Sequence, residues 1–182
     1  GPAPKKYEAS TILVILQSRL DRIVCDLIKI LGSDFSFVVR PHPVWKTDFE
    51  GNRDFLESSK NVVIDDPQSN LLVDRMMQAN VVVTGWSAVA VEALDFGVPV
   101  VFYHSHALKY FKRFVETGQM YVKTDLKGLE DKVKTLWRAS KCRKRENGIH
   151  SFDCGGLDRA VHFLERIEQG GVKPKAIEYN GA

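Results

Sequence analysis

The sequence predicts an α/β fold in which a single Rossmann-like parallel sheet carries helices on both faces. Apolar runs of strand length alternate with segments of helical period along the chain, an order typical of one parallel layer system. The run at residues 81–83 is β-branched and uninterrupted by polar residues, as expected of a parallel strand covered on both faces. The segment of residues 80–104 contains a complete strand, turn, helix and strand unit.

The elements follow one another in a regular order. Strands are predicted at residues 10–17, 35–40, 61–64, 81–83, 98–103 and 120–123. Helices are predicted at residues 21–31, 71–79, 106–117, 126–139 and 156–168, with a further helix after Ser87. The first helix is amphipathic, and Ser69 is the expected N-cap of the second. Pro99 opens the strand that follows the helix after Ser87.

The most informative segment is the one in which a strand stops abruptly at Thr84-Gly85-Trp86-Ser87 and a helix begins. Ser87 can cap this helix with its hydroxyl, and Phe96-Gly97 ends it. Such a turn leaves backbone N–H groups unpaired at a helix N-terminus, where a phosphate binds readily. Residues Gly85 to Ala88 are therefore a candidate nucleotide or phosphate site, although a well-capped unit without a ligand has the same pattern.

A second candidate site lies at Arg40-Pro41-His42-Pro43, where a predicted strand ends in a cation and an imidazole between prolines. The prolines fix the backbone and prevent a helix, so His42 is held at the carboxyl end of its strand. That edge of the sheet also carries the Gly85 turn. Arg40 and His42 could bind a diphosphate there, or they could be an ordinary strand exit.

Composition limits the classes of function. The chain has 182 residues, of which 44% are hydrophobic and 27% charged, and a net charge of +3, which is typical of a soluble domain with one core. No basic stripe interleaved with aromatics predicts a nucleic-acid partner. The three cysteines lack metal-ligand spacing and are expected to be reduced, which favours a cytoplasmic location. No signal peptide or membrane span is predicted, and no metal site.

Three segments are expected along the chain. Residues 1–9 are an N-terminal extension that begins with Gly1-Pro2, a possible protease scar. Residues 10–169 form the Rossmann-like nucleotide-binding domain, and residues 170–182 form a loosely ordered tail. The natural chain could therefore be longer than these residues.

Together the motifs resemble the C-terminal donor-binding domain of GT-B glycosyltransferases. The similarity is greatest to the bacterial surface-polysaccharide branch: CDP-glycerol glycerophosphotransferases, capsular Kdo transferases and bacterial polysialyltransferases. It covers residues 10–125 in order and spacing. The segments that carry it are Arg40–Pro43, Ile64–Ser69, Leu71-Leu72, Ala79-Asn80, Val83–Ser87, Val91–Leu94 and Phe96–Val100.

The resemblance implies roles for individual residues. His42 matches the histidine that contacts the donor phosphate, and Glu92 matches the acid that binds ribose hydroxyls. Arg40 stands where many relatives have Lys and would act beside His42 in catalysis. The residues that would bind the nucleotide are Ser69, Thr84, Gly85, Trp86, Ser87, Ala88 and Glu92. Trp86 replaces a small residue and would narrow the phosphate cradle or form a wall for the base.

Weaker candidates lie elsewhere. His104 and His106 could line the donor cleft or bind a metal, although two histidines without a third ligand more often form a polar loop. Asp65-Asp66 is expected to cap the next turn or approach the base. The basic run Lys141–Arg145 could contact an anionic membrane surface at the inner face, or it could be a solvated loop.

If the resemblance holds, the chain binds a nucleotide-sugar or CDP-polyol donor, with CMP or CDP favoured over UDP and no metal required. The acceptor would be a glycan or lipid-linked, and the general base would lie on a second lobe, from the same natural chain or a partner subunit. Two alternatives remain: a lobe of a sugar-nucleotide epimerase, which shares the two-lobed fold, and a non-catalytic nucleotide-binding or scaffolding domain.

Overall fold

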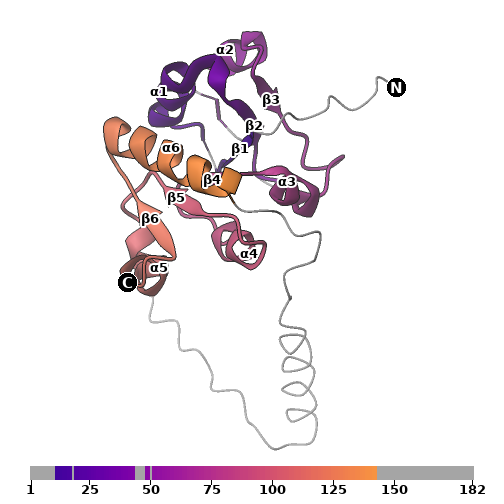
Figure 1. Ribbon diagram of the computed structural model, residues 1–182. Helices are drawn as coiled ribbons and strands as arrows, with labels where there is room; N and C mark the ends of the chain where they lie inside the picture. The colour runs from indigo at the N-terminus through magenta and orange to yellow at the C-terminus, as the bar shows by residue number, and fades with distance from the viewer. Residues whose placement is uncertain (1–10, 18, 44–47, 50, 143–182) are drawn as a thin grey trace, which may run out of the picture. The chain divides into compact units, whose positions relative to one another are not determined.

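The computed structural model describes residues 11–17, 19–43, 48–49 and 51–142 (Figure 1). Within these residues, six strands form one sheet in the order β3-β2-β1-β4-β5-β6. Every neighbouring pair is parallel. The strands are β1 (Thr11–Ile15), β2 (Ser36–Arg40), β3 (Val62–Ile64), β4 (Val81–Thr84), β5 (Val100–Phe102) and β6 (Met120–Val122). The predicted parallel α/β fold is confirmed.

The helices pack on the two faces of the sheet, and all but the last of those described lie between successive strands (Figure 1). They are α1 (Arg22–Leu31), the 3-10 turn η1 (Gly32–Asp34), α2 (Arg53–Ser58), α3 (Leu72–Gln78), α4 (Val89–Asp95), α5 (Ala107–Glu116) and α6 (Leu126–Cys142). No helix among the described residues is long and apolar enough to span a membrane.

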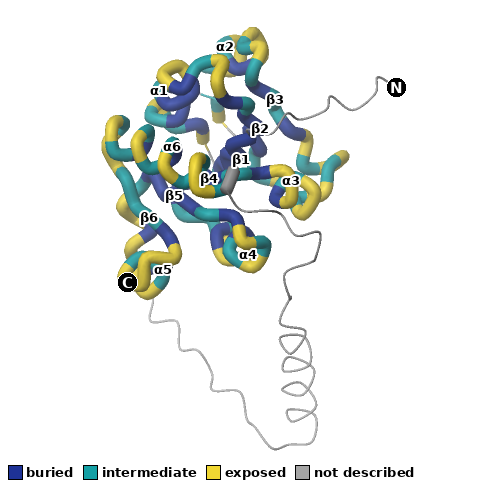
Figure 2. Tube along the Cα trace, viewed as in Figure 1, coloured by how far each residue is buried: buried dark blue, intermediate teal, exposed yellow. Residues whose placement is uncertain are grey.

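Two hydrophobic clusters, one on each face of the sheet, hold these layers together. Because successive side chains of a strand point to opposite faces, Ile12 and Val14 of β1 enter one cluster and Leu13 and Ile15 enter the other. Buried residues of α1, α2 and α6 contribute to the first cluster, and buried residues of α3, α4 and α5 contribute to the second. Figure 2 shows the resulting buried strands between partly exposed helices.

Differences from the predicted elements are few. The helix α2 was not predicted, and the predicted N-cap of α3 is wrong, because Leu71 and not Ser69 occupies that position. Helix α6 extends to Cys142, three residues beyond its predicted end. The predicted helix 156–168, the domain boundaries and most of the Lys141–Arg145 run lie outside the described residues.

Candidate functional site

The strand order fixes where a ligand is expected. From β1 the chain proceeds outward through β2 and β3, and it then returns to the other side of β1 to form β4, β5 and β6. In open α/β sheets, ligands bind outside the carboxyl ends of the strands where the order reverses. Here that position lies between β1 and β4. Ile15 is paired with both Arg40 and Thr84, so the carboxyl ends of β2, β1 and β4 are level.

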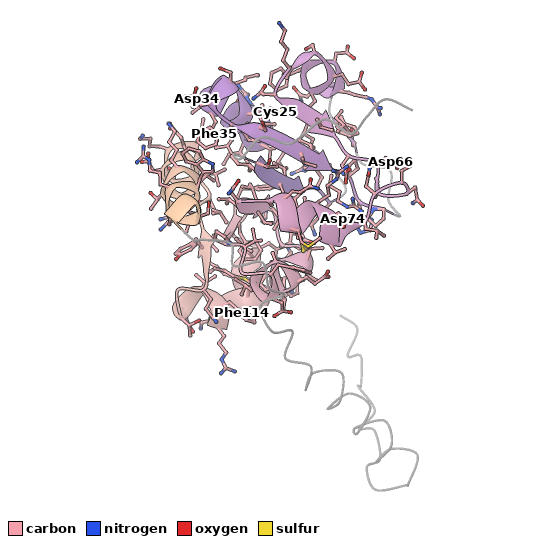
Figure 3. The ribbon with its side chains drawn as sticks, turned by 45° about the vertical axis from the view of Figure 1, so that its right-hand side comes forward. Cys25, Asp34, Phe35, Asp66, Asp74 and Phe114 are labelled. Carbon is pink, nitrogen blue, oxygen red and sulfur yellow. The ribbon has the colours of Figure 1, made fainter. Side chains whose placement is uncertain are left out.

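Figure 3 distinguishes the two edges of the sheet. Phe35, which precedes β2, and Asp66, which follows β3, are labelled on opposite sides of the molecule. The side that carries Asp66 is the carboxyl edge. The predicted residues after β2 and β4 therefore lie on this edge, as the parallel arrangement requires.

The turn after β4 is built into the sheet. The Thr84 side chain is fully buried, and its Oγ1 donates a hydrogen bond of 2.9 Å to the Ile15 carbonyl. This contact ties the end of β4 to the end of β1. The hydroxyl of Thr84 thus supports the turn from within the protein, and a contact between Thr84 and a phosphate stays a prediction.

Gly85 is required by space and not by an unusual backbone angle. A Cβ atom at this position would lie 2.9 Å from Gln17 Oε1 and 3.4 Å from the Tyr103 hydroxyl oxygen. The two neighbours follow the strands on either side of β4: Gln17 follows β1, and Tyr103 follows β5. The turn therefore packs closely against the β1 exit.

Ser87 and Ala88 lead from the turn into α4. The Val89 N–H donates to Ser87 Oγ at 3.3 Å, and Ala88 occupies the N-cap position. The hydroxyl of Ser87 thus serves the first helical amide, as predicted, although it lies one residue before the cap. Glu92 is exposed on α4. Whether Ser87, Ala88 or Glu92 contacts a nucleotide stays a prediction.

Trp86 is the centre of an aromatic cluster at the same edge. Its ring centroid lies 4.8 Å from that of His104 and 5.3 Å from that of His106, and the latter lies 5.5 Å from the Tyr110 ring. His104 Nδ1 accepts a hydrogen bond of 3.0 Å from the His106 N–H, so the neutral ring carries its proton on Nε2. The described residues contain no group of three potential metal ligands.

Arg40 occupies a different environment from the predicted one. Its guanidinium forms an ion pair with Asp65 and donates to the Asn70 carbonyl at 3.0 Å. Arg75 of α3 binds the other oxygen of the same carboxylate at 2.8 Å. The Asp65 side chain is completely buried, and those of Arg40 and Arg75 are only 9% and 11% exposed. In this structure Arg40 is therefore an anchor for the loops after β2 and β3, and its contact with a phosphate stays a prediction.

His42 lies half-buried just beyond this anchor. The loop that carries it is joined to the β3–α3 loop, because Gln68 Nε2 donates to the Pro43 carbonyl at 3.1 Å. The β3–α3 loop is itself ordered by Asp66. Its carboxylate accepts from the Gln68 N–H at 3.0 Å and from the Ser69 hydroxyl.

Asp66 therefore caps the turn as predicted, and Ser69 is committed to the same turn. The Ser69 hydrogen bond, followed by that of the Gln68 amide, lowers the pKa of the Asp66 carboxyl. Ser69 is exposed, and its predicted contact with a nucleotide is not tested by this arrangement.

The exit of β1 was missed by sequence reasoning. Arg19 Nε donates to Asp21 at 2.9 Å, and a side-chain hydrogen bond joins Asp21 to Tyr103. Burial, and then the nearby Asp21 carboxylate, raises the pKa of the Tyr103 phenol. The sequence does show polar residues, Gln-Ser-Arg, after the first strand. They point to a ligand site only once the strand order is known, because that order places β1 at the switch point.

Comparison with solved structures supports the fold. One similar structure is a UDP-GlcNAc 2-epimerase from Neisseria meningitidis, solved with UDP-GlcNAc bound, with 19% sequence identity and a TM-score of 0.56. The matched region covers 87% of this chain and 45% of the epimerase chain. Another is a variant of the wall teichoic acid polymerase TagF, with 14% sequence identity and a TM-score of 0.51. The matched region covers 89% of this chain and 45% of the TagF chain. The chain thus spans less than half the length of each.

The sequence itself identifies the family. No curated protein matches the chain significantly. A family model, however, matches residues 14–117, a stretch that begins in β1 and ends just after α5. It contains the exits of β2, β3, β4 and β5 described above. Because this match covers more than half of the 182 residues, the chain belongs to the CDP-glycerol:poly(glycerophosphate) glycerophosphotransferase family.

Proposed function

We propose that this chain is the donor-binding lobe of a transferase that uses a nucleotide-activated donor to build a surface polymer. The observation that carries the proposal is the meeting of the Gly85 turn and the β1 exit at the switch point, in a member of this family. The family description names CDP-glycerol as a donor, which favours a cytidine nucleotide. TagF is described as a wall teichoic acid polymerase, which supports a cell-surface polymer as the product.

The reaction class follows from the donor. An acceptor hydroxyl attacks the phosphorus of the glycerophosphate group, and the P–O bond to the cytidine monophosphate breaks. A sugar donor would instead react at its anomeric carbon. In both cases negative charge accumulates on the departing phosphate. Hydrogen-bond donors of the protein that point toward this phosphate therefore lower the activation barrier.

The chain's own residues supply this stabilisation in the proposal. His42 lies at the β2 exit and the amides of Gly85 to Ala88 at the β4 exit, on either side of β1. The Ser87 hydroxyl adds a further polar contact, and Glu92 on α4 would accept hydrogen bonds from the ribose. Arg40, paired with Asp65, would keep the His42 loop in position.

The remaining parts of the reaction are proposed to lie outside this lobe. The acceptor, a glycan or a lipid-linked chain, and the base that removes its proton would be held by a second lobe, from a longer natural chain or a partner subunit. A lipid-linked acceptor would place the enzyme at the inner face of the membrane, and the Lys141–Arg145 run would contact that surface.

Nucleotide titrations test this proposal. The chain is titrated with CMP, CDP, UDP, GDP and UDP-GlcNAc while amide chemical shifts are followed. Cytidine nucleotides should bind most tightly and perturb residues 85–88 and His42. His42→Ala or Ser87→Ala should weaken CDP binding by about 1–3 kcal/mol, the cost of a charge-assisted hydrogen bond.

Ser58→Ala is the matched control, because Ser58 is exposed on the remote helix α2. Preferential binding of UDP-GlcNAc would favour an epimerase lobe. Unchanged CDP affinity in both site variants, with their folds intact, would contradict the assigned site.

A further inference from the structure

The two elements of the proposed site are not on neighbouring strands. His42 follows β2 and the Gly85 turn follows β4, and β1 lies between these strands. Since the three strand ends are level, the loop that leaves β1 must lie between the two elements. Arg19 is in this loop.

On the β4 side, a chain of contacts connects Arg19 to the turn. Arg19 Nε donates to Asp21 at 2.9 Å, and Asp21 is hydrogen-bonded to the buried Tyr103. The Tyr103 hydroxyl oxygen lies 3.4 Å from the position that a Cβ atom on Gly85 would take. Arg19 is therefore connected to the turn through two intermediate side chains, those of Asp21 and Tyr103.

On the β2 side, the loop is fastened to the segment that follows His42. Leu20 N–H donates to the Asp48 carbonyl at 2.7 Å, and Arg19 and Asp48 form a parallel β-bridge. The backbone of Arg19 is thus positioned by β-type pairing, in addition to the side-chain contact with Asp21. The position of Arg19 is therefore fixed by two sets of contacts, one with Asp21 and Tyr103 and the other with Asp48.

Exposure separates Arg19 from Arg40 and Arg75. Its side chain is 60% exposed, whereas those of Arg40 and Arg75 are 9% and 11% exposed and share the buried Asp65 carboxylate. A ligand can reach Arg19 without disturbing the core. Arg40, in contrast, is nearly buried, and its guanidinium already contacts the Asp65 carboxylate and the Asn70 carbonyl.

We propose that Arg19 is the cation that binds the donor's diphosphate, the role that the sequence suggested for Arg40. This inference rests on the proposed function and deepens it. A guanidinium binds phosphate oxygens through two parallel N–H groups and keeps its charge at all working pH values, so it suits a diphosphate that gains charge during transfer. Asp21 is a positioning residue, because it orients Arg19 and is itself oriented by Tyr103.

The test compares variants of the chain with three ligands: CDP, inorganic pyrophosphate and CMP. Arg19→Gln should weaken CDP and pyrophosphate binding by about 10- to 100-fold and CMP binding by less, because CMP lacks the second phosphate. Arg19→Lys should recover part of the affinity, since it restores the charge without the planar geometry. Asp21→Asn should give a smaller loss for the same two diphosphate ligands.

Arg22→Gln is the matched control. Arg22 is three residues away on α1, has a side chain that is 91% exposed, and pairs with Asp26. The substitution therefore removes the same charge without altering the contacts of Arg19 with Asp21 or of Asp21 with Tyr103, and it should leave all three affinities unchanged. Arg40→Gln should lower the melting temperature, which Arg19→Gln should not.

The inference is overturned if Arg19→Gln leaves CDP affinity unchanged while Ser87→Ala weakens it. It is also overturned if Arg19→Gln and Arg22→Gln weaken binding equally, which would reveal only a long-range charge effect. If the unaltered chain binds neither CDP nor CMP, the proposed function fails and the inference fails with it.

Discussion

The carboxylate of Asp65 forms ion pairs with two arginines at once. This completely buried carboxylate binds Arg40 from β2 on one oxygen and Arg75 from α3 on the other. Two nearly buried guanidiniums therefore share this carboxylate, which lies at the exit of β3. Removing one partner of a buried ion pair leaves an uncompensated charge in a medium of low dielectric constant.

Asp65→Asn should consequently destabilise the fold by about 3–5 kcal/mol, as measured by urea denaturation. Asp74→Asn is the matched control, because Asp74 is an exposed acid on the neighbouring helix α3 (Figure 3). It should change stability by less than about 0.5 kcal/mol. Equal stability of the two variants would show that the cluster contributes no net stabilisation.

Asp66, the next residue, gives a pH dependence of known sign. Hydrogen bonds from Ser69 and the Gln68 amide lower the pKa of its carboxyl from the ordinary value of 3.8. A group with a lowered pKa stabilises the folded state above its ordinary value and loses that contribution as pH falls through the folded pKa. The β3–α3 turn should therefore loosen only below pH 3.8.

Amide chemical shifts of Gln68 and Ser69, followed from about pH 5 to 2, measure this transition. Its midpoint should lie below 3.8, and the transition should be absent in Asp66→Asn. A midpoint at or above the ordinary value would mean that the hydrogen bonds from Ser69 and Gln68 do not favour the ionised carboxyl.

The β4 turn shows how strand order gives a short segment its constraints. Gly85 faces Gln17 from the β1 exit and Tyr103 from the β5 exit, so these residues, distant in sequence, leave no room for a side chain at this position. Gly85→Ala should destabilise the protein by about 1–3 kcal/mol through overpacking. Chemical denaturation of the single and double variants with Gln17→Ala forms a mutant cycle.

The double variant should recover most of the loss, because the Cβ atom would then meet no Gln17 amide. Gly97→Ala is a useful comparison, since Gly97 has a φ of 66° and no atom lies within 4 Å of the position that a Cβ atom would take there. Its loss should come from backbone strain alone and should not be recovered by Gln17→Ala. Additive effects of Gly85→Ala and Gln17→Ala would contradict direct contact.

The elements that could be predicted are those whose formation depends on residues close together in the sequence. The strand at residues 81–83 and the helix stop at Phe96-Gly97 depend on local composition, and both are observed. Helix α2 was missed because it is a short helix with one buried side chain, that of Leu56, and so has little apolar period. The N-cap predicted for Ser69 failed because its hydroxyl binds Asp66.

The candidate site was predictable only in part, for a related reason. The motif at His42 and the Gly85 turn could be placed at one edge because both follow strands. That β1 lies between them is a property of the sheet order, which no local pattern encodes. For this reason the sequence points to Arg40 as the phosphate-binding cation and gives no comparable signal for the exposed Arg19.

If the proposed function holds, the chain should bind its nucleotide without a divalent ion. The residues proposed to hold the diphosphate are backbone amides, an imidazole and a guanidinium, and the sequence offers no Asp-x-Asp pair at a strand exit to hold Mg²⁺. Calorimetric titration of CDP in EDTA and in Mg²⁺ should give the same affinity. A large loss on chelation would indicate a metal-dependent mode of binding.

In the proposal, this chain binds the nucleotide but does not catalyse transfer by itself. The reaction needs an acceptor held within about 3.5 Å of the reacting centre and a base to take its proton. In the proposal, both come from a second lobe. The 182-residue chain should therefore bind CDP weakly and turn over no donor, as measured by release of CMP from CDP-glycerol in the presence of an acceptor polymer.

Adding the second lobe, in a longer natural chain or as a separate protein, should restore turnover. The His42→Ala variant of that complete enzyme should lose it, because the leaving phosphate would lack its imidazole contact. Ser58→Ala should retain it, since Ser58 lies on α2, away from the switch point. Transfer at an enzymatic rate by this chain alone would show that the acceptor and the base are held within these residues, and the division of the site between two lobes would then be wrong.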